Sequence, residues 1–401
     1  MEFNTSGILS TGGNIRPIDR PRQCAQRRSL LLRGAAFAVL GLSLAGCGTF
    51  HSAEEAVGLG GGSAPSGTIA SRYLGSVAAD DTQAVDLARR VLLGGGNAAD
   101  AATTIALTLT VTEPGRAGLD GGGVCLVKPG GAGAVEELDF LPQSSAGETI
   151  PVPGMVRGLA ALEGRYGALH WQQVVAPVEA LATTGITVTP TLLADLQAAG
   201  LGAGGPGGRP LAVGDILPQH AVSATLAQLR TAGAADFYTG TEGSALVGDG
   251  VPAQPLANYS PAWRSAASLV TGNARLYFPQ GPAGVAIQSA WQAAQGSSDP
   301  AARFAAARAA AFAAGDSGID RPSGSIAFLA TDASGLAVDC AIGLGRPFGT
   351  GQVVEPMGIF ASAPFDGAAQ ASLAPMMSTS SNGEQLLGRF RRRRQLCRTS
   401  R

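Results

Sequence analysis

Charged, aromatic and metal-binding side chains are scarce in this chain. Of its 401 residues, 14% are charged and 5% are aromatic, and there are only three histidines and five cysteines. The formal net charge of −1 offers no broad attraction to nucleic acid, so we expect no nucleic-acid partner. No cysteines have the Cys-x-x-Cys spacing typical of metal and redox sites, so we expect no metal or cofactor. Cys125 and Cys340 fall in strand-like runs and are expected to be buried as small apolar side chains.

The histidines do not suggest a catalytic set. His51 lies in a Gly-rich N-terminal stretch, His170 stands at a helix start, and His220 follows the segment GDILPQ. Their spacing indicates no Ser–His–Asp arrangement, and each is expected to be structural or exposed.

The first 47 residues are typical of an export signal. Arg27 and Arg28 give a positive region ahead of an apolar stretch at residues 30–45, which is too short and too interrupted for a good membrane span. That stretch ends in LAGC, which resembles a bacterial lipobox, so Cys47 is expected to carry lipid. The protein would then be held by a lipid anchor on the periplasmic side of a bacterial cell envelope. The alternative is an ordinary secretory signal that happens to end in cysteine.

Both flanks of the chain differ in composition from its middle. Residues 48–67 include GLGGGSAPSG and are expected to form a flexible tether. Residues 377–401 contain a basic run at 391–394 and are expected to form a disordered tail.

The most informative segment is residues 94–123, GGGNAADAATTIALTLTVTEPGRAGLDGGG. Asn97 can accept from the free N–H groups of a first helical turn, so it is predicted to be an N-cap. Residues 98–111 are almost all apolar or small, which predicts a helix buried on every side. Pro114 cannot continue that helix, and the glycines at 121–123 allow the backbone to turn back in close contact with other backbone.

Further elements are expected along the rest of the chain. Periodicity and capping predict helices at residues 81–93, 221–232, 284–295 and 299–314. Alternating patterns around turn residues predict hairpins within residues 268–278 and 325–342. Buried helices together with hairpins suit two sheets flanked by helices.

These segments occur in the order seen in the γ-glutamyltranspeptidase family. The family motif GGNAxDAA matches residues 95–102, EPxxSGIGGGG resembles residues 113–123, and PGxVxGL matches residues 153–159. GDILPQ and DFYTG are later matches, and the resemblance extends over roughly residues 68–370. The resemblance implies an α+β fold, the four-layer αββα sandwich of N-terminal nucleophile hydrolases, incomplete at the C-terminus. Residues 68–324 would be the large-subunit-like region and residues 325–376 a truncated small-subunit-like region.

Members of this family cut themselves before a Thr or Ser, which becomes the nucleophile and uses its own α-amine as the base. Aligning Asp332, Gly335 and the FGTG segment places Ser325 at the catalytic Thr, directly after Gly324. Asp366, in APFDG, matches the acidic residue that holds the substrate's ammonium group. The alternatives are that Ser325 merely begins a strand and that Asp366 is an exposed turn residue.

Several positions depart from the family pattern. Leu141 stands where an Arg would bind the substrate's α-carboxylate, and Ile326 and Ala327 replace the second Thr and the His that follow the nucleophile. Because neither side chain can donate a hydrogen bond, the sequence predicts that most of the protein stays uncut.

Two functions therefore stay open at this level. The first is acyl transfer or hydrolysis of γ-glutamyl amides such as glutathione, with a small γ-glutamyl compound as the partner. The second is a catalytically degenerate envelope lipoprotein with a binding or structural role. The oligomeric state stays open.

Overall fold

The structure is a computed structural model that describes residues 74–131, 133–144, 150–202, 208–315, 324–380 and 386–388. The predicted export signal with Cys47, the tether at 48–67 and the basic run at 391–394 lie outside the described residues. Among the residues that are described, no helix has the length and apolar character needed to cross a membrane.

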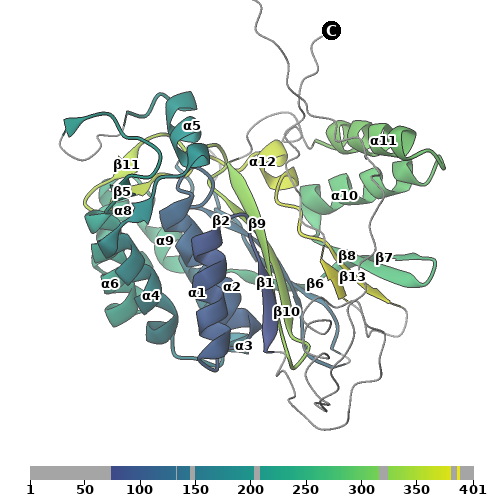
Figure 1. Cartoon of the computed structure of the whole chain (residues 1–401), viewed down its shortest axis with the longest axis horizontal. Coiled ribbons are helices and arrows are strands. Elements are labelled where there is room, and N and C mark those ends of the chain that lie inside the picture. Colours follow the sequence, from purple (N-terminus) through teal and green to yellow (C-terminus); the bar gives the residue numbers. More distant parts are fainter. Residues whose placement is uncertain are drawn as a thin grey trace, which may run out of the picture. The chain divides into compact units, whose positions relative to one another are not determined.

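A six-stranded sheet with the order β1-β9-β10-β2-β3-β6 runs through the middle of the molecule (Figure 1). All neighbouring strands in it are antiparallel. Every residue of β2 and β10 is buried, because both faces of the sheet are covered. The strands are β1 (Gly75–Ala78), β2 (Gly122–Lys128), β3 (Glu136–Phe140), β6 (Ala262–Ser265), β9 (Ser325–Asp332) and β10 (Ala337–Gly343).

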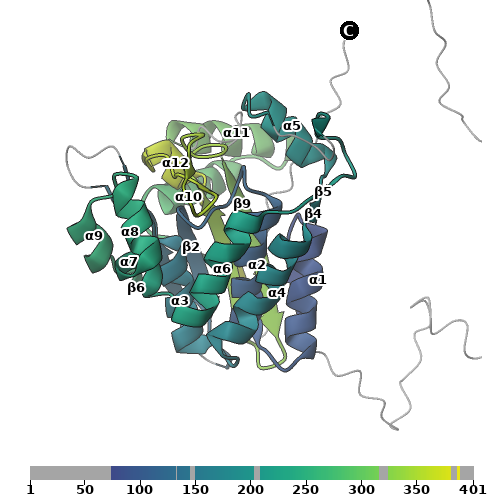
Figure 2. The same cartoon turned by 90° about the vertical axis from the view of Figure 1, so that its left-hand side faces the viewer.

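A layer of helices covers one face of this sheet (Figure 2). Its centre is α2 (Ala98–Thr112), which packs on β9 and β10 and has all of its residues buried, as its composition predicted. Asn97 caps it as expected, since its side chain accepts from Ala99 N and Asp100 N. The helices around it are α1 (Thr82–Leu93), α3 (Met155–Tyr166), α4 (Trp171–Thr184) and α6 (His220–Ala232).

A second sheet, with the order β14-β13-β8-β7, packs on the other face. Leu126 of β2 and Ala337 of β10 form a buried cluster with Met377 of β13, and Tyr277 of β8 packs against it. Helix α10 contacts β8 and α11 contacts α10, which completes a fourth layer. The predicted four-layer αββα architecture is therefore confirmed. These elements are β7 (Ala267–Thr271), β8 (Ala274–Phe278), β13 (Met377–Ser380), β14 (Leu386–Gly388), α10 (Gly281–Ala294) and α11 (Pro300–Ala313).

Short elements connect these layers. They are β4 (Ile186–Thr187), α5 (Pro190–Ala198), β5 (Ile216–Leu217), α7 (Asp236–Thr239), α8 (Thr241–Gly248), α9 (Ala253–Asn258), β11 (Val353–Val354), β12 (Ile359–Phe360) and α12 (Gly367–Ala371).

Two expectations need correction. We placed the start of a disordered tail at residue 377, but Met377–Ser380 form β13 and pair with β8, because Met377 fills the space between the sheets. Cys125 and Cys340 are buried as predicted, but they form a disulfide instead of packing as free thiols. The two residues are directly opposite each other on β2 and β10, a register that composition does not reveal.

Acidic side chains gather at the N-terminus of α2. Asp100 accepts from Asn97 N at 2.6 Å and from Leu169 N at 3.0 Å, and Asp332 of β9 accepts from Ala98 N at 3.0 Å. Both carboxylates also lie at the positive end of the helix dipole. Glu163 of α3 lies beside Asp100. The pKa of Glu163 is raised to about 8, chiefly because the carboxyl group is buried.

We predict that Glu163→Gln removes a pH-dependent loss of stability. The folded protein keeps the Glu163 proton up to about pH 8, whereas the unfolded chain releases it near 4.5, so the free energy of unfolding falls as pH rises between these values. The thermal midpoint of the variant minus that of the parent should increase by on the order of a few degrees as the pH rises from about 5 to about 9. Asp86→Asn, an exposed change on α1, serves as the control. The same pH dependence in the parent and in Glu163→Gln would contradict this assignment.

Candidate functional site

Ser325, the predicted nucleophile, begins β9 at one end of the central sheet and is half-buried. It pairs with Gly343 of β10. A Cβ at position 343 would lie 3.2 Å from the Cβ of Ser325, so this glycine keeps the space beside the serine open. The structure thus places Ser325 in a paired strand, opposite a residue that has no side chain.

Gly324, which precedes Ser325, is held by the loop after β10. It has φ +57, and an added Cβ would lie 2.1 Å from the carbonyl carbon of Arg346. The Gly324 carbonyl accepts a hydrogen bond from Leu344 N at 3.0 Å. An N–H placed on a carbonyl oxygen stabilises the negative charge that develops there during nucleophilic attack. Because this donor belongs to the backbone, the Gly324 carbonyl still has a hydrogen-bond donor although residues 326 and 327 have no donor side chains.

Ser372 is a site residue that sequence reasoning missed. Its Oγ lies 3.5 Å from Ser325 Oγ and donates at 2.7 Å to Ala369 O. A hydroxyl has one proton, so Ser372 Oγ can donate to Ala369 O or to Ser325 Oγ, but not to both at once. The residue is the C-cap of α12, and nothing in the sequence pattern indicates that α12 lies over the start of β9.

Asp366 lies at the other end of α12. It is exposed and forms the N-cap of the helix, since its Oδ1 accepts from Ala369 N at 2.8 Å. The cap occupies one carboxylate oxygen and keeps the side chain at the helix N-terminus. The role of Asp366 in holding an ammonium group stays a prediction.

The arginines that might replace the missing carboxylate clamp are engaged elsewhere. Arg116 pairs with Asp195 at 2.8 Å and lies 3.8 Å from Glu113. Arg157 donates to the carbonyl oxygens of Ala257 and Tyr259 and stacks 4.1 Å from the ring centre of Tyr238. Neither guanidinium is therefore available to take the place left by Leu141.

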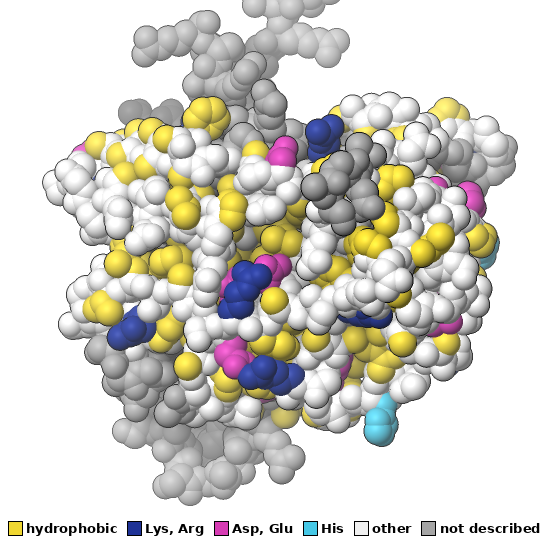
Figure 3. Space-filling view, turned by 180° about the vertical axis from the view of Figure 1, so that it is seen from behind, with side chains coloured by type: hydrophobic (Ala, Val, Ile, Leu, Met, Phe, Trp, Pro, Cys, Tyr) yellow, Lys and Arg dark blue, Asp and Glu magenta, His cyan; other side chains and the backbone are white. Residues whose placement is uncertain are grey.

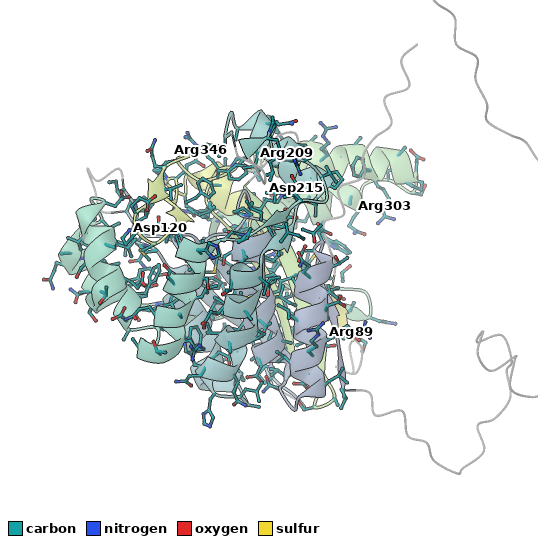
Figure 4. The ribbon with its side chains drawn as sticks, turned by 60° about the vertical axis from the view of Figure 1, so that its left-hand side comes forward. Arg89, Asp120, Arg209, Asp215, Arg303 and Arg346 are labelled. Atoms are coloured by element: carbon teal, nitrogen blue, oxygen red, sulfur yellow. A yellow bond between two sulfur atoms is a disulfide. The ribbon has the colours of Figure 1, made fainter. Side chains whose placement is uncertain are left out.

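The glycine loop before β2 carries a buried acid, Asp120 (Figure 4). One carboxylate oxygen accepts from Ser362 N at 2.7 Å, which ties this loop to the segment that leads into α12. Asp120 is fully buried, and this burial raises its pKa to about 7. Its other oxygen has no hydrogen-bond partner within the described residues.

The described residues contain no group of three His, Cys, Asp or Glu side chains that could hold a metal ion. A cavity of about 200 Å³ between α2, α5 and β12 is mainly apolar, and Ser325, Asp366 and Arg346 are not among its lining residues. Charged side chains are sparse on the face drawn in Figure 3, where some of the basic groups lie beside acidic ones.

Comparison with known proteins agrees with this arrangement. A family model described as gamma-glutamyltranspeptidase matches residues 84–292. The human glutathione hydrolase 5 proenzyme is 32% identical over 249 residues, which cover 53% of this chain and 42% of that protein. The crystal structure of cephalosporin acylase from Bacillus halodurans aligns with a TM-score of 0.65 and 20% identity, over 78% of this chain and 76% of that one. The crystal structure of gamma-glutamyltranspeptidase from Helicobacter pylori aligns with a TM-score of 0.55 and 22% identity, over 62% of this chain and 84% of that one.

These findings differ in what they establish. This chain spans less than half of the human relative, 42% of its length. At 20% and 22% identity the two solved structures show a shared fold. The family model, in contrast, covers more than half of the 401 residues. The chain belongs to the gamma-glutamyltranspeptidase family.

Proposed function

We propose that the protein is a self-processing amide hydrolase and acyltransferase that acts on γ-glutamyl amides, with Ser325 as its nucleophile. The observation that carries the proposal is the hydrogen bond from Leu344 N to Gly324 O, directly before a hydroxyl residue at the start of β9. The sequence favoured an uncut chain because Ile326 and Ala327 offer no side-chain donor. The Leu344 N–H supplies a donor from the backbone, and one such donor is worth about 3 kcal/mol in a transition state.

Self-processing requires an acyl shift. Ser325 Oγ attacks the Gly324 carbonyl carbon, the carbon–nitrogen bond breaks, and the hydroxyl proton passes to the freed Ser325 amine. Water then hydrolyses the ester, which gives a Gly324 carboxylate and restores the hydroxyl. The negative charge of the intermediate forms on the oxygen that faces Leu344 N.

Turnover uses Ser325 Oγ again as the nucleophile, and the α-amine freed by the cleavage now serves as the base. An α-amine has a pKa of about 8, so near neutral pH a useful fraction is free to accept the hydroxyl proton. Ser325 Oγ then attacks the γ-glutamyl carbonyl, and the leaving amine takes that proton. Water or an amino acid receives the acyl group. The substrate class rests on family membership and on the similarity to a glutathione hydrolase.

Cleavage before Ser325 is the first test. On a reducing gel, the parent should give two fragments, the smaller one beginning Ser325-Ile326-Ala327, and Ser325→Ala should give one band. Without reductant the cleaved parent should still run as one species, because the Cys125–Cys340 disulfide joins the two sides of the cut. Ser325→Thr, which keeps the hydroxyl, should be cut, and Ser260→Ala, at an exposed serine, should behave as the parent.

An uncut parent on the reducing gel would overturn the proposed activity. It would favour the second function that the sequence left open, a degenerate protein with a binding or structural role. The observation that favours this second function is that Arg116 and Arg157 are both engaged with groups of the chain itself.

We also propose that the protein is anchored in the bacterial cell envelope through lipid on Cys47, as the LAGC segment indicates. Metabolic labelling with a fatty-acid analogue should mark the parent and fail to mark Cys47→Ala. Cys397→Ala is the matched control and should be labelled normally. Label that persists in Cys47→Ala would rule out this attachment site.

A further inference from the structure

We propose that the apolar cavity between α2, α5 and β12 is a binding site for one small, uncharged, apolar molecule. The cavity has a volume of about 200 Å³. An apolar cavity of roughly 150 Å³ in a protein interior takes up benzene or xenon. The space here is therefore large enough for a benzene ring that carries a short alkyl group. This inference goes beyond the proposed function and does not depend on it.

Two helices present leucine and valine side chains to the cavity. Leu192 and Leu196 of α5 are both buried and both line it. Residues four positions apart lie on the same face of a helix, so α5 turns one apolar face toward this space. Val222, in the first turn of α6, lines the cavity from another side. The helical part of the wall is therefore apolar.

The β4–β5 pair contributes one of its two faces. Ile186 and Leu217 are directly opposite each other in this antiparallel pair, and both line the cavity. Their neighbours Thr187 and Ile216 form the other pair and are exposed. Because adjacent residues of a strand point to opposite faces, this register gives the cavity two apolar side chains and keeps the threonine out of it.

The two polar side chains in the wall are engaged with the backbone of α2. Thr110 Oγ1 donates to Leu107 O at 2.7 Å. Gln219 Nε2 donates to Val111 O at 2.8 Å. The other residues that line the cavity are Gly, Ala, Pro, Val, Leu, Ile and Phe, so none of the lining residues is charged. A carboxylate or ammonium group inside the cavity would lose its water without gaining an opposite charge, so the lining selects an uncharged ligand.

The edge of the cavity is apolar as well. Phe360 of β12 lines it and is half-buried, and its partner Val353 on β11 is exposed. Opposite residues of an antiparallel pair lie on the same face, so Val353 extends the apolar surface of Phe360 toward solvent. Figure 1 shows β11, β5 and α5 in the same part of the molecule. A ligand that reaches this edge would also remove apolar surface from water there.

The cavity is a neighbour of the candidate site and has separate lining residues. Gly118 belongs to its wall, and a Cβ at Gly118 would lie 2.7 Å from Cδ2 of Leu344, whose N–H donates to Gly324 O. Ser325 does not line the cavity. Binding in the cavity therefore does not require a processed chain.

The test measures the binding of toluene to the full chain by calorimetry and through the thermal midpoint. The parent should bind toluene saturably, and its thermal midpoint should rise with toluene concentration. Benzoate has the same ring with a carboxylate and should not bind, since no lining residue is a cation. Ser325→Ala should bind toluene as the parent does, because Ser325 is not a lining residue.

Two substitutions test where toluene binds. Leu196→Trp puts a larger side chain into the cavity and should weaken toluene binding by about tenfold or more, the size of effect that a misfit of one small group has in an apolar pocket. Leu93→Trp is the matched control at an exposed leucine and should leave binding unchanged. Leu192→Ala enlarges the cavity and should shift its preference from toluene toward n-butylbenzene. Leu229→Ala, a buried change on α6 outside the lining, should leave that preference unchanged.

The absence of saturable toluene binding to the parent would overturn this inference, and so would benzoate binding of equal strength. Unchanged toluene binding in a folded Leu196→Trp would place the ligand elsewhere and overturn it as well. If Leu196→Trp does not fold, the Leu192→Ala comparison decides, and an unchanged preference between the two hydrocarbons contradicts the assignment. If the parent stays uncut on the reducing gel but binds toluene with these dependences, this inference stands and the proposed activity fails.

Discussion

The site depends on backbone segments that touch without side chains between them. A Cβ at Gly121 would lie 2.1 Å from Gly343 O, and one at Gly324 would lie 2.1 Å from the carbonyl carbon of Arg346. Both distances are far inside van der Waals contact, so only glycine permits these approaches. They bring the loop before β2, the start of β9 and the loop after β10 to one end of the sheet. Ser325 and the Leu344 N–H that donates to the carbonyl before it owe their proximity to these contacts.

The same contacts let this part of the chain differ from the family pattern and still place a donor on the Gly324 carbonyl. Where the family has donor side chains, this chain has Ile326 and Ala327, and the Leu344 N–H lies on the carbonyl instead. A backbone donor depends on the path of the chain and not on residue type, so its position survives substitutions that remove hydroxyl and imidazole groups. A group that binds a substrate carboxylate differs from a backbone donor, because it must be a cationic side chain. Residue 141 is a leucine in this chain, so a carboxylate would find no cation at that position.

Local sequence patterns were sufficient to predict the helices and strands. They were insufficient to predict which segments pair or pack together. Asn97 and the small residues after it predicted a capped, buried α2, and turn residues predicted the β7–β8 hairpin. The Cys125–Cys340 bond and β13 depend on the register between segments far apart in sequence, which local periodicity does not carry. Ser372 was missed for the same reason, since its place beside Ser325 depends on how α12 packs. The order of layers came from family resemblance, not from residue patterns.

The disulfide bears on the fold, on the proposed cleavage and on the proposed location of the protein. It joins β2 to β10, so one cysteine lies on each side of the Gly324–Ser325 bond, and 215 residues separate them in sequence. Disulfides of this buried, structural kind form in oxidising compartments such as the periplasm and are rare in the cytosol. An export signal ending at Cys47 would deliver the chain to such a compartment. The bond would then keep the two products of self-processing covalently joined in the central sheet, so the strand that carries the new N-terminus would stay in register with its neighbour β10.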